Sequence, residues 1–242
     1  MPLKILPSLV DGIDIHGPGS TAFEEGLSSV LGRAPRELLL PAIPFSVIVE
    51  NRTDRVVAYL GVRFDMVNPR AQQISVVHYA DALRNPAKAE LRPGTKRFIC
   101  AEPEYTALVL RGTVAPRTRG RMNLDNLRRM LQIRASIDCV AFSDGTFLGP
   151  DSQKAFERLD QERQAEKELI RELELIHTDG QQEVESLLAR AVQDPDRRAR
   201  RNAARKLLEA YQAGGAAEAL IRARSFRHRI PLSRELSPVT NP

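Results

Sequence analysis

Short apolar runs rich in β-branched residues alternate with turn-forming residues over the first 150 positions of the chain. The run at 44–50 is followed by the polar stretch Asn51-Arg52-Thr53-Asp54, after which a second apolar run occupies 55–64. Two such runs separated by a few turn residues are typical of paired antiparallel strands. The pattern therefore predicts a β-hairpin over 44–64.

Further short strands are predicted after this hairpin. They lie at 73–79, 95–101, 105–111, 131–142 and 146–148. Asp144-Gly145 joins the last two, because this dipeptide readily takes the positive φ angles of a two-residue hairpin loop. Several short strands without long helical segments between them favour two packed antiparallel sheets over a parallel sheet. We therefore predict a β-sandwich over residues 1–150.

Helical patterns occur at one place inside this part and throughout the part that follows it. Thr21 and Glu24 resemble a capping box and predict a short helix over 22–31. Beyond residue 150 the apolar positions recur with the helical period of 3.6 residues. The predicted helices there span 151 to about 177, 182–193, about 196–212 and 216–224, with breaks at Asp194-Pro195-Asp196 and Gly214-Gly215. The chain is thus α+β, with a charged α-helical region at 151–234 and a loose tail at 235–242.

Length and composition indicate a folded chain outside the membrane. The 242 residues are 42% apolar, which is enough to fill a core. No stretch approaches the roughly 18 consecutive apolar residues of a membrane-spanning helix, and Pro2 and Pro7 interrupt any apolar run at the start. A cytoplasmic protein is predicted, provided that Met1 is the true start.

The charges are segregated along the helical region, although the net charge of the chain is only +5. Residues 151–194 carry 12 acidic and 6 basic side chains, whereas residues 195–234 carry 3 acidic and 11 basic side chains. Blocks of opposite sign that follow one another closely can fold back on each other. We expect them to meet within one chain or across a homodimer more readily than either meets nucleic acid.

Two candidate groups of side chains have ordinary structural explanations beside chemical ones. Cys100 and Cys139 lie in apolar, strand-like runs, and buried reduced thiols are favoured over a disulfide between strands. The four histidines stand far apart, so solvated or structural roles are favoured over a site that the fold assembles. No catalytic residue is predicted from either group.

Two loops near the N-terminus contain residues that could bind a cation or a phosphate, but each also has an ordinary structural explanation. Asp11, Asp14 and His16 offer cation ligands, but a turn is favoured because the further ligands of a calcium loop are absent. The stretch Gly17-Pro18-Gly19-Ser20-Thr21 resembles a phosphate-binding loop but has no lysine before its hydroxyl residues. A helix cap is therefore favoured, and no metal or cofactor is predicted.

The arginines are the strongest candidate binding residues. A long loop is predicted between 111 and 129, and the helix after residue 195 has a basic outer face. The residues predicted to contact phosphates or an acidic partner are Arg117, Arg119, Arg121, Arg198, Arg201 and Arg205. A solvated face is nevertheless the favoured explanation, with phosphate binding as the alternative, since the chain has no Trp and only four Tyr to stack on bases.

Three stretches carry a resemblance to a known group of proteins. They are Val49-Glu50-Asn51-Arg52-Thr53, Leu91-Arg92-Pro93-Gly94, and 137–151 with its Asp-Gly turn running into Gly149-Pro150-Asp151. Over about residues 40–175 the chain resembles uncharacterised bacterial proteins with an immunoglobulin-like β-sandwich and a helical C-terminal tail. The segment 194–205 is also similar to one HEAT-repeat helix. The resemblance implies a fold and no activity.

The sequence predicts a non-catalytic protein-binding or scaffolding module, because a sandwich is expected and no catalytic motif accompanies it. Two alternatives stay open. One is a nucleic-acid-associated protein that uses the arginine-rich loop and the basic helices. The other is an enzyme whose site is assembled from residues distant in sequence.

Overall fold

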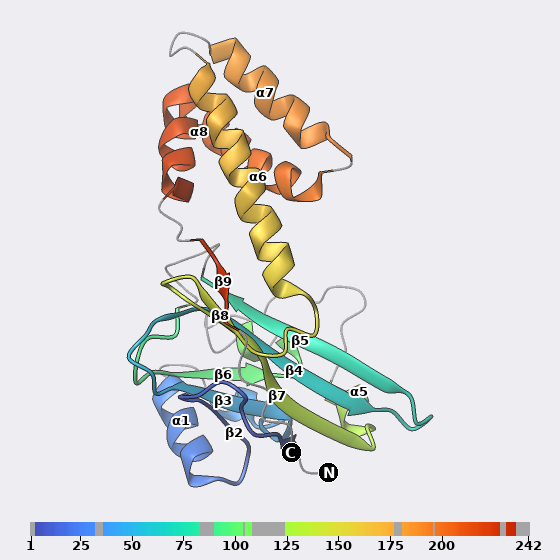
Figure 1. Cartoon of the computed structure of the whole chain (residues 1–242). Helices are drawn as coiled ribbons and strands as arrows, with labels where there is room; N and C mark the ends of the chain where they lie inside the picture. The colour runs from blue at the N-terminus through green and yellow to red at the C-terminus, as the bar shows by residue number, and fades with distance from the viewer. Residues whose placement is uncertain are drawn as a thin grey trace. The chain divides into compact units, whose positions relative to one another are not determined.

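The chain divides into two compact units, Met1–Gln153 with Arg234–Pro242, and Lys154–Ser233. The computed structural model describes residues 3–31, 36–82, 90–103, 105–107, 124–176, 181–195, 197–227 and 231–235. The first unit contains the strands and the second contains three long helices (Figure 1). The chain is therefore α+β, with antiparallel-rich sheets first and helices after them.

Two sheets form the first unit. The larger sheet has the order β5-β4-β7-β8-β9, and β1 adds to β7 in parallel. Its strands are β1 Lys4–Ile5, β4 Val57–Val67, β5 Gln73–Asp81, β7 Gln132–Phe142, β8 Thr146–Leu148 and β9 Ser233–Arg234. The smaller sheet has the order β2-β3-β6, with strands β2 Ile13–His16, β3 Ser46–Asn51 and β6 Lys96–Cys100. β1 pairs with β7 in parallel. The pairings β2–β3, β3–β6, β4–β5, β4–β7 and β7–β8 are antiparallel.

The two sheets share one hydrophobic core. Every second residue of β4 from Leu60 to Met66 enters this core, as the two-residue period of a strand requires. Val47, Val49 and Phe98 enter it from the smaller sheet, and helix α1 Thr21–Leu31 adds Phe23 and Leu27. In β3, by contrast, the consecutive residues Val47, Ile48 and Val49 are all buried in this core.

The predicted hairpin over 44–64 is wrong, because β3 and β4 belong to different sheets. β3 pairs with β2 and β6, whereas β4 pairs with β5 and β7. Residues between the two strands carry the chain from one sheet to the other. The buried Asn51 holds this crossing, since its Nδ2 donates to the carbonyl oxygens of Arg55 and Leu91 at 2.7 and 2.8 Å.

The predicted strand at 105–111 is also wrong where the structure describes it. Residues 105–107 are helical, and 108–111 lie outside the described residues. The backbone N–H of Tyr105 donates to the carbonyl oxygen of Glu102, and the Thr106 hydroxyl accepts the N–H of Cys100 at 2.8 Å. These bonds turn the chain directly after β6, so that an extended strand cannot follow.

The predicted helix over 22–31 is confirmed as α1, but its cap differs from the prediction. The N–H of Phe23 donates to Ser20 Oγ at 3.2 Å, so Ser20 caps the helix in place of Thr21. The predicted hairpin of β7 and β8 is confirmed, but residues 143–145 join its strands in place of a two-residue loop, and of the Asp-Gly pair only Gly145 has a positive φ, of 96°. Besides residues 105–107, the short helical segments described in this unit are α2 Arg36–Leu39, the 3-10 turn η1 Ile43–Phe45, and α5 Leu124–Arg128.

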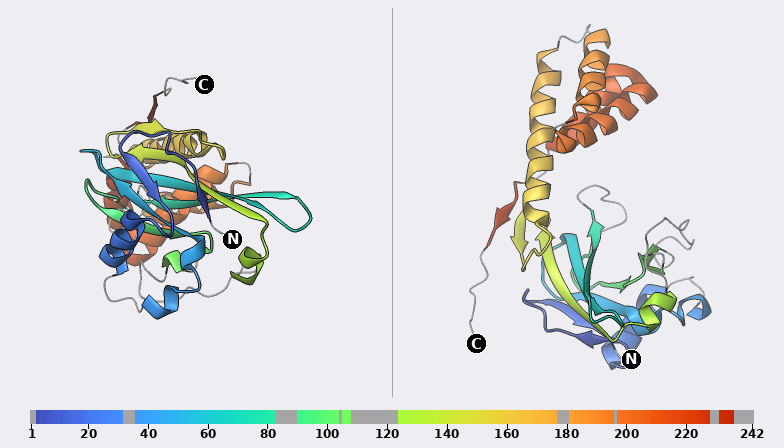
Figure 2. Two further views of the ribbon diagram at one scale, coloured as in Figure 1. Left: turned by 90° about the horizontal axis from the view of Figure 1, so that it is seen from below. Right: turned by 90° about the vertical axis from the view of Figure 1, so that its right-hand side faces the viewer.

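The second unit is built from helices α6 Ala155–Leu175, α7 Gln181–Gln193 and α8 Arg198–Arg227 (Figure 2). Helix α6 starts four residues later than predicted, because Asp151 and Lys154 have positive φ angles of 54° and 52°. Helix α8 is interrupted at Gly214-Gly215, as the sequence predicts. A second core joins the three helices through Leu169, Leu173, Val184, Leu188, Ala204 and Leu207.

Two further predictions have outcomes in the fold. Cys100 and Cys139 are both buried and neither forms a disulfide, as expected. Burial raises the pKa of the Cys100 thiol to about 12, so this cysteine is an inert thiol. Among the helices of the described ranges, none combines the length and apolar character needed to cross a bilayer.

Candidate functional site

The predicted arginine sites fall into two groups. Arg117, Arg119 and Arg121 lie outside the described residues. Arg198, Arg201 and Arg205 lie on α8, where Arg198 and Arg205 are exposed and form no ion pair with any described acidic residue. Arg201 donates from Nη1 to the carbonyl oxygen of Pro195 at 2.9 Å. Two of the three thus present a free cation to solvent.

Other cations of α8, and Arg197 directly before it, are already paired within the helical unit. Arg200 donates to both carboxylate oxygens of Glu172, at 2.7 and 2.6 Å. Arg197 and Lys206 lie 3.3 and 3.6 Å from the carboxylates of Glu168 and Glu166. These contacts show that the acidic and basic blocks meet within one chain, and the expected preference for this pairing over nucleic acid stays a prediction. Of these acidic partners, Glu166 is buried.

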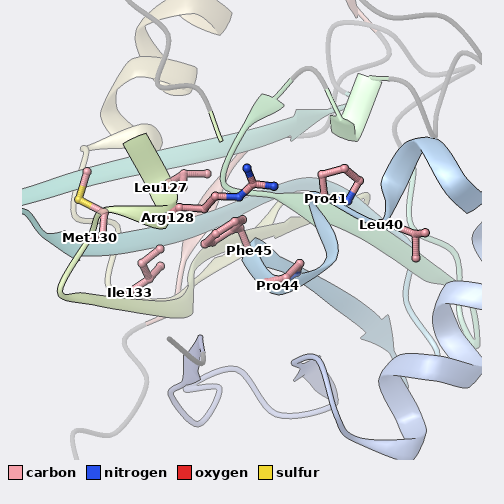
Figure 3. Close-up of a pocket in the computed structure, with 8 residues that line it drawn as sticks. All are labelled: Leu40, Pro41, Pro44, Phe45, Leu127, Arg128, Met130 and Ile133. Carbon is pink, nitrogen blue, oxygen red and sulfur yellow. The ribbon is translucent and has the colours of Figure 1, made fainter. Parts of the chain in front are cut away.

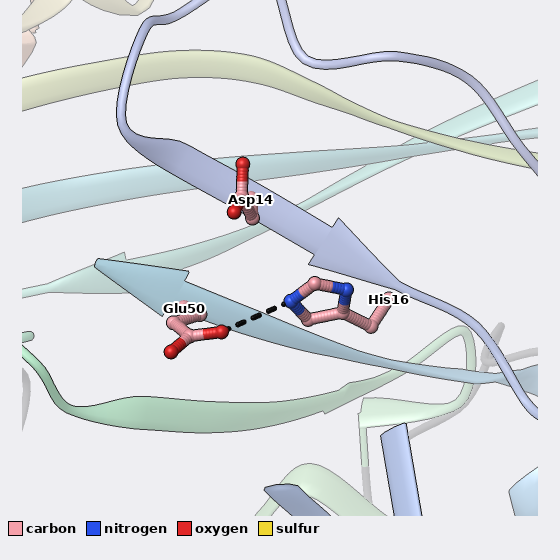
Figure 4. Close-up of side chains that lie close together, drawn as sticks. All are labelled: Asp14, His16 and Glu50. Atoms are coloured by element: carbon pink, nitrogen blue, oxygen red, sulfur yellow. Dashed lines mark hydrogen bonds and ion pairs between the residues drawn. The ribbon is translucent and has the colours of Figure 1, made fainter. Parts of the chain in front are cut away.

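A cluster of ionisable side chains joins β2 to β3 (Figure 4). Asp14 and His16 lie on β2 and Glu50 on β3, and their potential ligand atoms lie within 4.8 Å of one another. His16 Nε2 is 3.1 Å from Glu50 Oε2. Arg52 Nε is 2.9 Å from Asp14 Oδ2, and Lys96 Nζ is 3.8 Å from Glu50 Oε1.

The surrounding cations decide what this Asp14–His16–Glu50 cluster can do. Burial would raise the pKa of Glu50, but the hydrogen bond with His16 and the charges of Lys96 and Arg52 outweigh it and lower the pKa. Both carboxylates are therefore already neutralised by the chain itself. A bound metal ion would have to displace these partners, so the cluster is best explained as an ion-pair network that joins the strands.

A second cluster consists of Asp138, Cys139 and Asp151, all of which are buried. Asp138 and Cys139 are consecutive residues of β7, and Asp151 follows β8. One potential ligand atom from each lies within 4.8 Å of the others. Sequence reasoning missed this group, because it treated Cys139 only as a buried thiol and placed Asp151 at a helix start.

The first unit contains a pocket of about 280 Å³ (Figure 3), which we call the apolar pocket. Its lining residues are Leu40, Pro41, Pro44, Phe45, Leu127, Arg128, Met130 and Ile133. Phe45, Leu127 and Ile133 are buried, whereas Leu40 is 55% exposed. The pocket therefore has an apolar floor, an exposed leucine and one cationic side chain.

The elements around the apolar pocket explain its shape. Pro44 in η1 fixes one φ angle just before β3 begins, and Leu127 and Arg128 come from the short helix α5. Ile133 lies near the start of β7. Segments far apart in sequence meet here, and for that reason no local motif could have pointed to the pocket.

The guanidinium of Arg128 is available to a ligand. Its partner is Asp125 at 3.2 Å, one turn earlier in α5, and the two side chains are 57% and 72% exposed. Exposed pairs of this kind contribute only about 0–1 kcal/mol, so Arg128 can exchange Asp125 for another carboxylate at little cost. The apolar pocket thus suits an apolar group with an acidic neighbour.

Searches of protein-family models, curated proteins and solved structures found no match to this chain.

Proposed function

We propose that this chain is a non-catalytic protein-binding module, and that the apolar pocket of the first unit is its docking site. The observation that carries the proposal is the exposed Leu40 beside a floor of Phe45, Leu127 and Ile133. An exposed apolar side chain next to an apolar hollow favours association with another apolar surface.

The partner is expected to present a bulky apolar side chain next to Asp or Glu. The apolar side chain would fill the hollow, and the carboxylate would accept hydrogen bonds from Arg128. Buried apolar anchors give most of the affinity at protein interfaces, while charges at the rim chiefly set orientation and specificity. This division of roles matches a pocket with one cation at its edge.

A phage-displayed library of random peptides, selected against the full chain, tests this proposal. We expect the enriched peptides to share a bulky apolar residue within a few positions of Asp or Glu. The Arg128→Glu variant should bind the best of them about tenfold more weakly, because a like-charge contact replaces an opposite-charge one. A peptide with Lys in place of its acidic residue should recover part of the lost affinity.

Arg134→Glu is the matched control, since Arg134 is an exposed arginine of β7 outside the pocket lining. It should leave peptide binding unchanged. Enriched peptides without acidic residues, or equal binding by the Arg128→Glu variant, would contradict the proposed site.

The same proposal includes the fold: the first unit, which carries the docking site, is an immunoglobulin-like β-sandwich. Its support is a pair of antiparallel-rich sheets that share one core. Loops at the ends of such sheets commonly carry binding surfaces, and the apolar pocket is built from segments next to β3 and β7.

Nucleic-acid binding is the second candidate, favoured by the exposed Arg198 and Arg205 on α8. We expect mixed-sequence DNA or RNA to bind weakly and to dissociate near physiological salt, because contacts to phosphate alone depend steeply on salt. A fluorescence titration at 150 mM salt measures this. Submicromolar binding that is lost in the combined Arg198→Glu, Arg201→Glu and Arg205→Glu variant, with folding intact, would place nucleic acid first.

A further inference from the structure

We propose that Asp138, Cys139 and Asp151 form a binding site for a zinc-like divalent cation. The site lies entirely within the first unit, and the proposal does not depend on the apolar pocket or its partner. It rests on three observations: a β-bulge, an unpartnered buried carboxylate oxygen, and the turn that holds Asp151.

The β-bulge explains how two consecutive strand residues come to serve one site. Gly61 of β4 pairs with Cys139, but the next residue, Val62, pairs with Ile137. Asp138 is therefore the extra residue of a bulge. Side chains of consecutive strand residues normally point to opposite faces, and a bulge re-aims one of them. The bulge thus allows Asp138 and Cys139 to approach the same point.

The carboxylate of Asp138 is incompletely satisfied. The side chain is only 1% exposed. Its Oδ1 accepts the backbone N–H of Ser152 at 3.1 Å, but its Oδ2 has no hydrogen-bond partner. A buried polar atom without a partner is unfavourable, and a buried carboxylate beside another carboxylate is more so. A cation between Asp138 and Asp151 would remove both costs.

The turn after β8 holds Asp151 in place. The N–H of Asp151 donates to the carbonyl oxygen of Asp138 at 2.9 Å, and Asp151 has a positive φ of 54°. Gly149 has a φ of 106°, and a Cβ at this position would lie 2.6 Å from the same carbonyl oxygen. The backbone of the turn is thus pressed against β7 in a conformation that only glycine accommodates at 149.

The ligand set selects the class of cation. The three potential ligand atoms lie within 4.8 Å of one another. Around a tetrahedral zinc ion, with bonds of about 2.0–2.3 Å, ligand atoms lie roughly 3.3–3.8 Å apart, so a small contraction suffices. A thiolate ligand favours zinc over calcium or magnesium, which prefer oxygen atoms alone. The Cys139 proton would pass to solvent on binding, and a fourth ligand position would remain.

Cobalt(II) titration of the chelator-treated full chain tests this site, because a cobalt–thiolate bond produces a charge-transfer absorption band in the near ultraviolet. We expect the band to appear with one equivalent of cobalt and to disappear when one equivalent of zinc is added. Cys139→Ser should abolish the band. Cys100→Ser is the matched control and should retain it, since Cys100 is the other buried cysteine and lies outside the cluster.

Zinc affinity, measured by competition with a chromogenic chelator, gives an independent readout. Asp138→Asn and Asp151→Asn should each weaken binding by at least the 10- to 100-fold that loss of a ligand's outer partner typically costs. Asp14→Asn should leave the affinity unchanged, because Asp14 belongs to the other cluster. Circular dichroism verifies that each variant is folded.

The cobalt titration of the wild-type chain tests the proposed metal site even if a variant fails to fold. The proposal is overturned by the absence of a charge-transfer band in the wild type, or by a band that persists in Cys139→Ser. It is also overturned by zinc binding that Asp138→Asn leaves unchanged, which would place the metal elsewhere.

Discussion

Asn51 is a residue whose buried side chain satisfies all of its hydrogen-bonding groups. It is 0% exposed, and besides its two donor bonds its Oδ1 accepts the N–H and the hydroxyl of Thr53 at 3.0 and 2.7 Å. These bonds join the end of β3, the crossing to β4, and Leu91. A single amide thus fixes the point where the chain changes sheets, since each bond left unmade in a buried site would be costly.

Asp144 is a second residue whose surroundings set its chemistry. Arg55 Nη2 lies 2.6 Å from Asp144 Oδ2, and the Thr146 N–H donates to Asp144 Oδ1 at 2.9 Å. The hydrogen bond from Arg55 is the main cause that lowers the pKa of Asp144 to about 2, against the opposing effect of burial. The folded state therefore favours the ionised carboxylate.

The Asp144→Asn variant should be less stable than the wild type by about 0.5–1 kcal/mol at pH 7, a small effect because the Asp144 side chain is 50% exposed. An unfolded aspartate has a pKa of about 3.9, above the folded value, so the stabilisation is present above pH 4 and is lost as the pH falls towards 2. Urea unfolding at several pH values measures this difference.

Asp125→Asn is the control for that experiment. Asp125 also pairs with an arginine, but its side chain is 72% exposed, so little change in stability is expected at any pH. A wild-type advantage over Asp144→Asn that stayed constant from pH 7 to pH 2 would contradict the assigned role of the carboxylate.

At the scale of secondary-structure elements, α6 and α8 are joined by apolar packing and oriented by charge. Leu169 and Leu173 of α6 share a core with Ala204 and Leu207 of α8. The two hydrogen bonds between Arg200 and Glu172 lie beside this core. The hydrogen bond from Arg200 lowers the pKa of Glu172 despite the opposing effect of burial. Apolar burial supplies most of the association energy, and the ion pair selects one relative orientation.

Arg200→Ala should destabilise the helical unit by about 1–2 kcal/mol, because the Arg200 side chain is only 11% exposed and loses packing as well as the bidentate pair. Arg198→Ala is the matched control on the same helix and should change stability by less than about 0.5 kcal/mol. Urea unfolding followed by helical circular dichroism measures both. Equal effects of the two substitutions would show that the pair is dispensable.

At the scale of the whole molecule, the described residues form two hydrophobic cores, one in each unit. The residues of the first core all lie between Val10 and Phe142, and those of the second all lie between Leu169 and Ala223. A unit with its own core can fold by itself. The apolar pocket belongs to the first unit, and the basic face of α8 belongs to the second.

A fragment comprising residues 154–233 should therefore be helical and should melt cooperatively by circular dichroism. Its Leu188→Asp variant should lose this cooperativity, because Leu188 is 0% exposed in the second core and a buried charge there has no partner. A fragment without helical signal, while the full chain remains helical, would show that the second unit depends on the first.

Local sequence patterns determined the elements whose formation depends on near neighbours. Helix α1, the hairpin of β7 and β8, and the break of α8 at Gly214-Gly215 agree with prediction. These elements depend on signals that act within a few residues: periodicity, turn dipeptides and paired glycines. Such signals can be recognised in the sequence alone. The opposite charges of the two helical blocks also predicted that these blocks would pair with each other.

Only the tertiary structure decided which strands pair and which side chains meet. The sequence placed β3 beside β4 in a hairpin, whereas β3 pairs with β2 and β6 across 29 and 44 intervening residues. The apolar pocket and the cluster of Asp138, Cys139 and Asp151 arise from the same long-range arrangement, the latter through a single bulged residue. Strand partners and bulges are chosen by the best simultaneous burial of distant segments, and no local pattern encodes that choice.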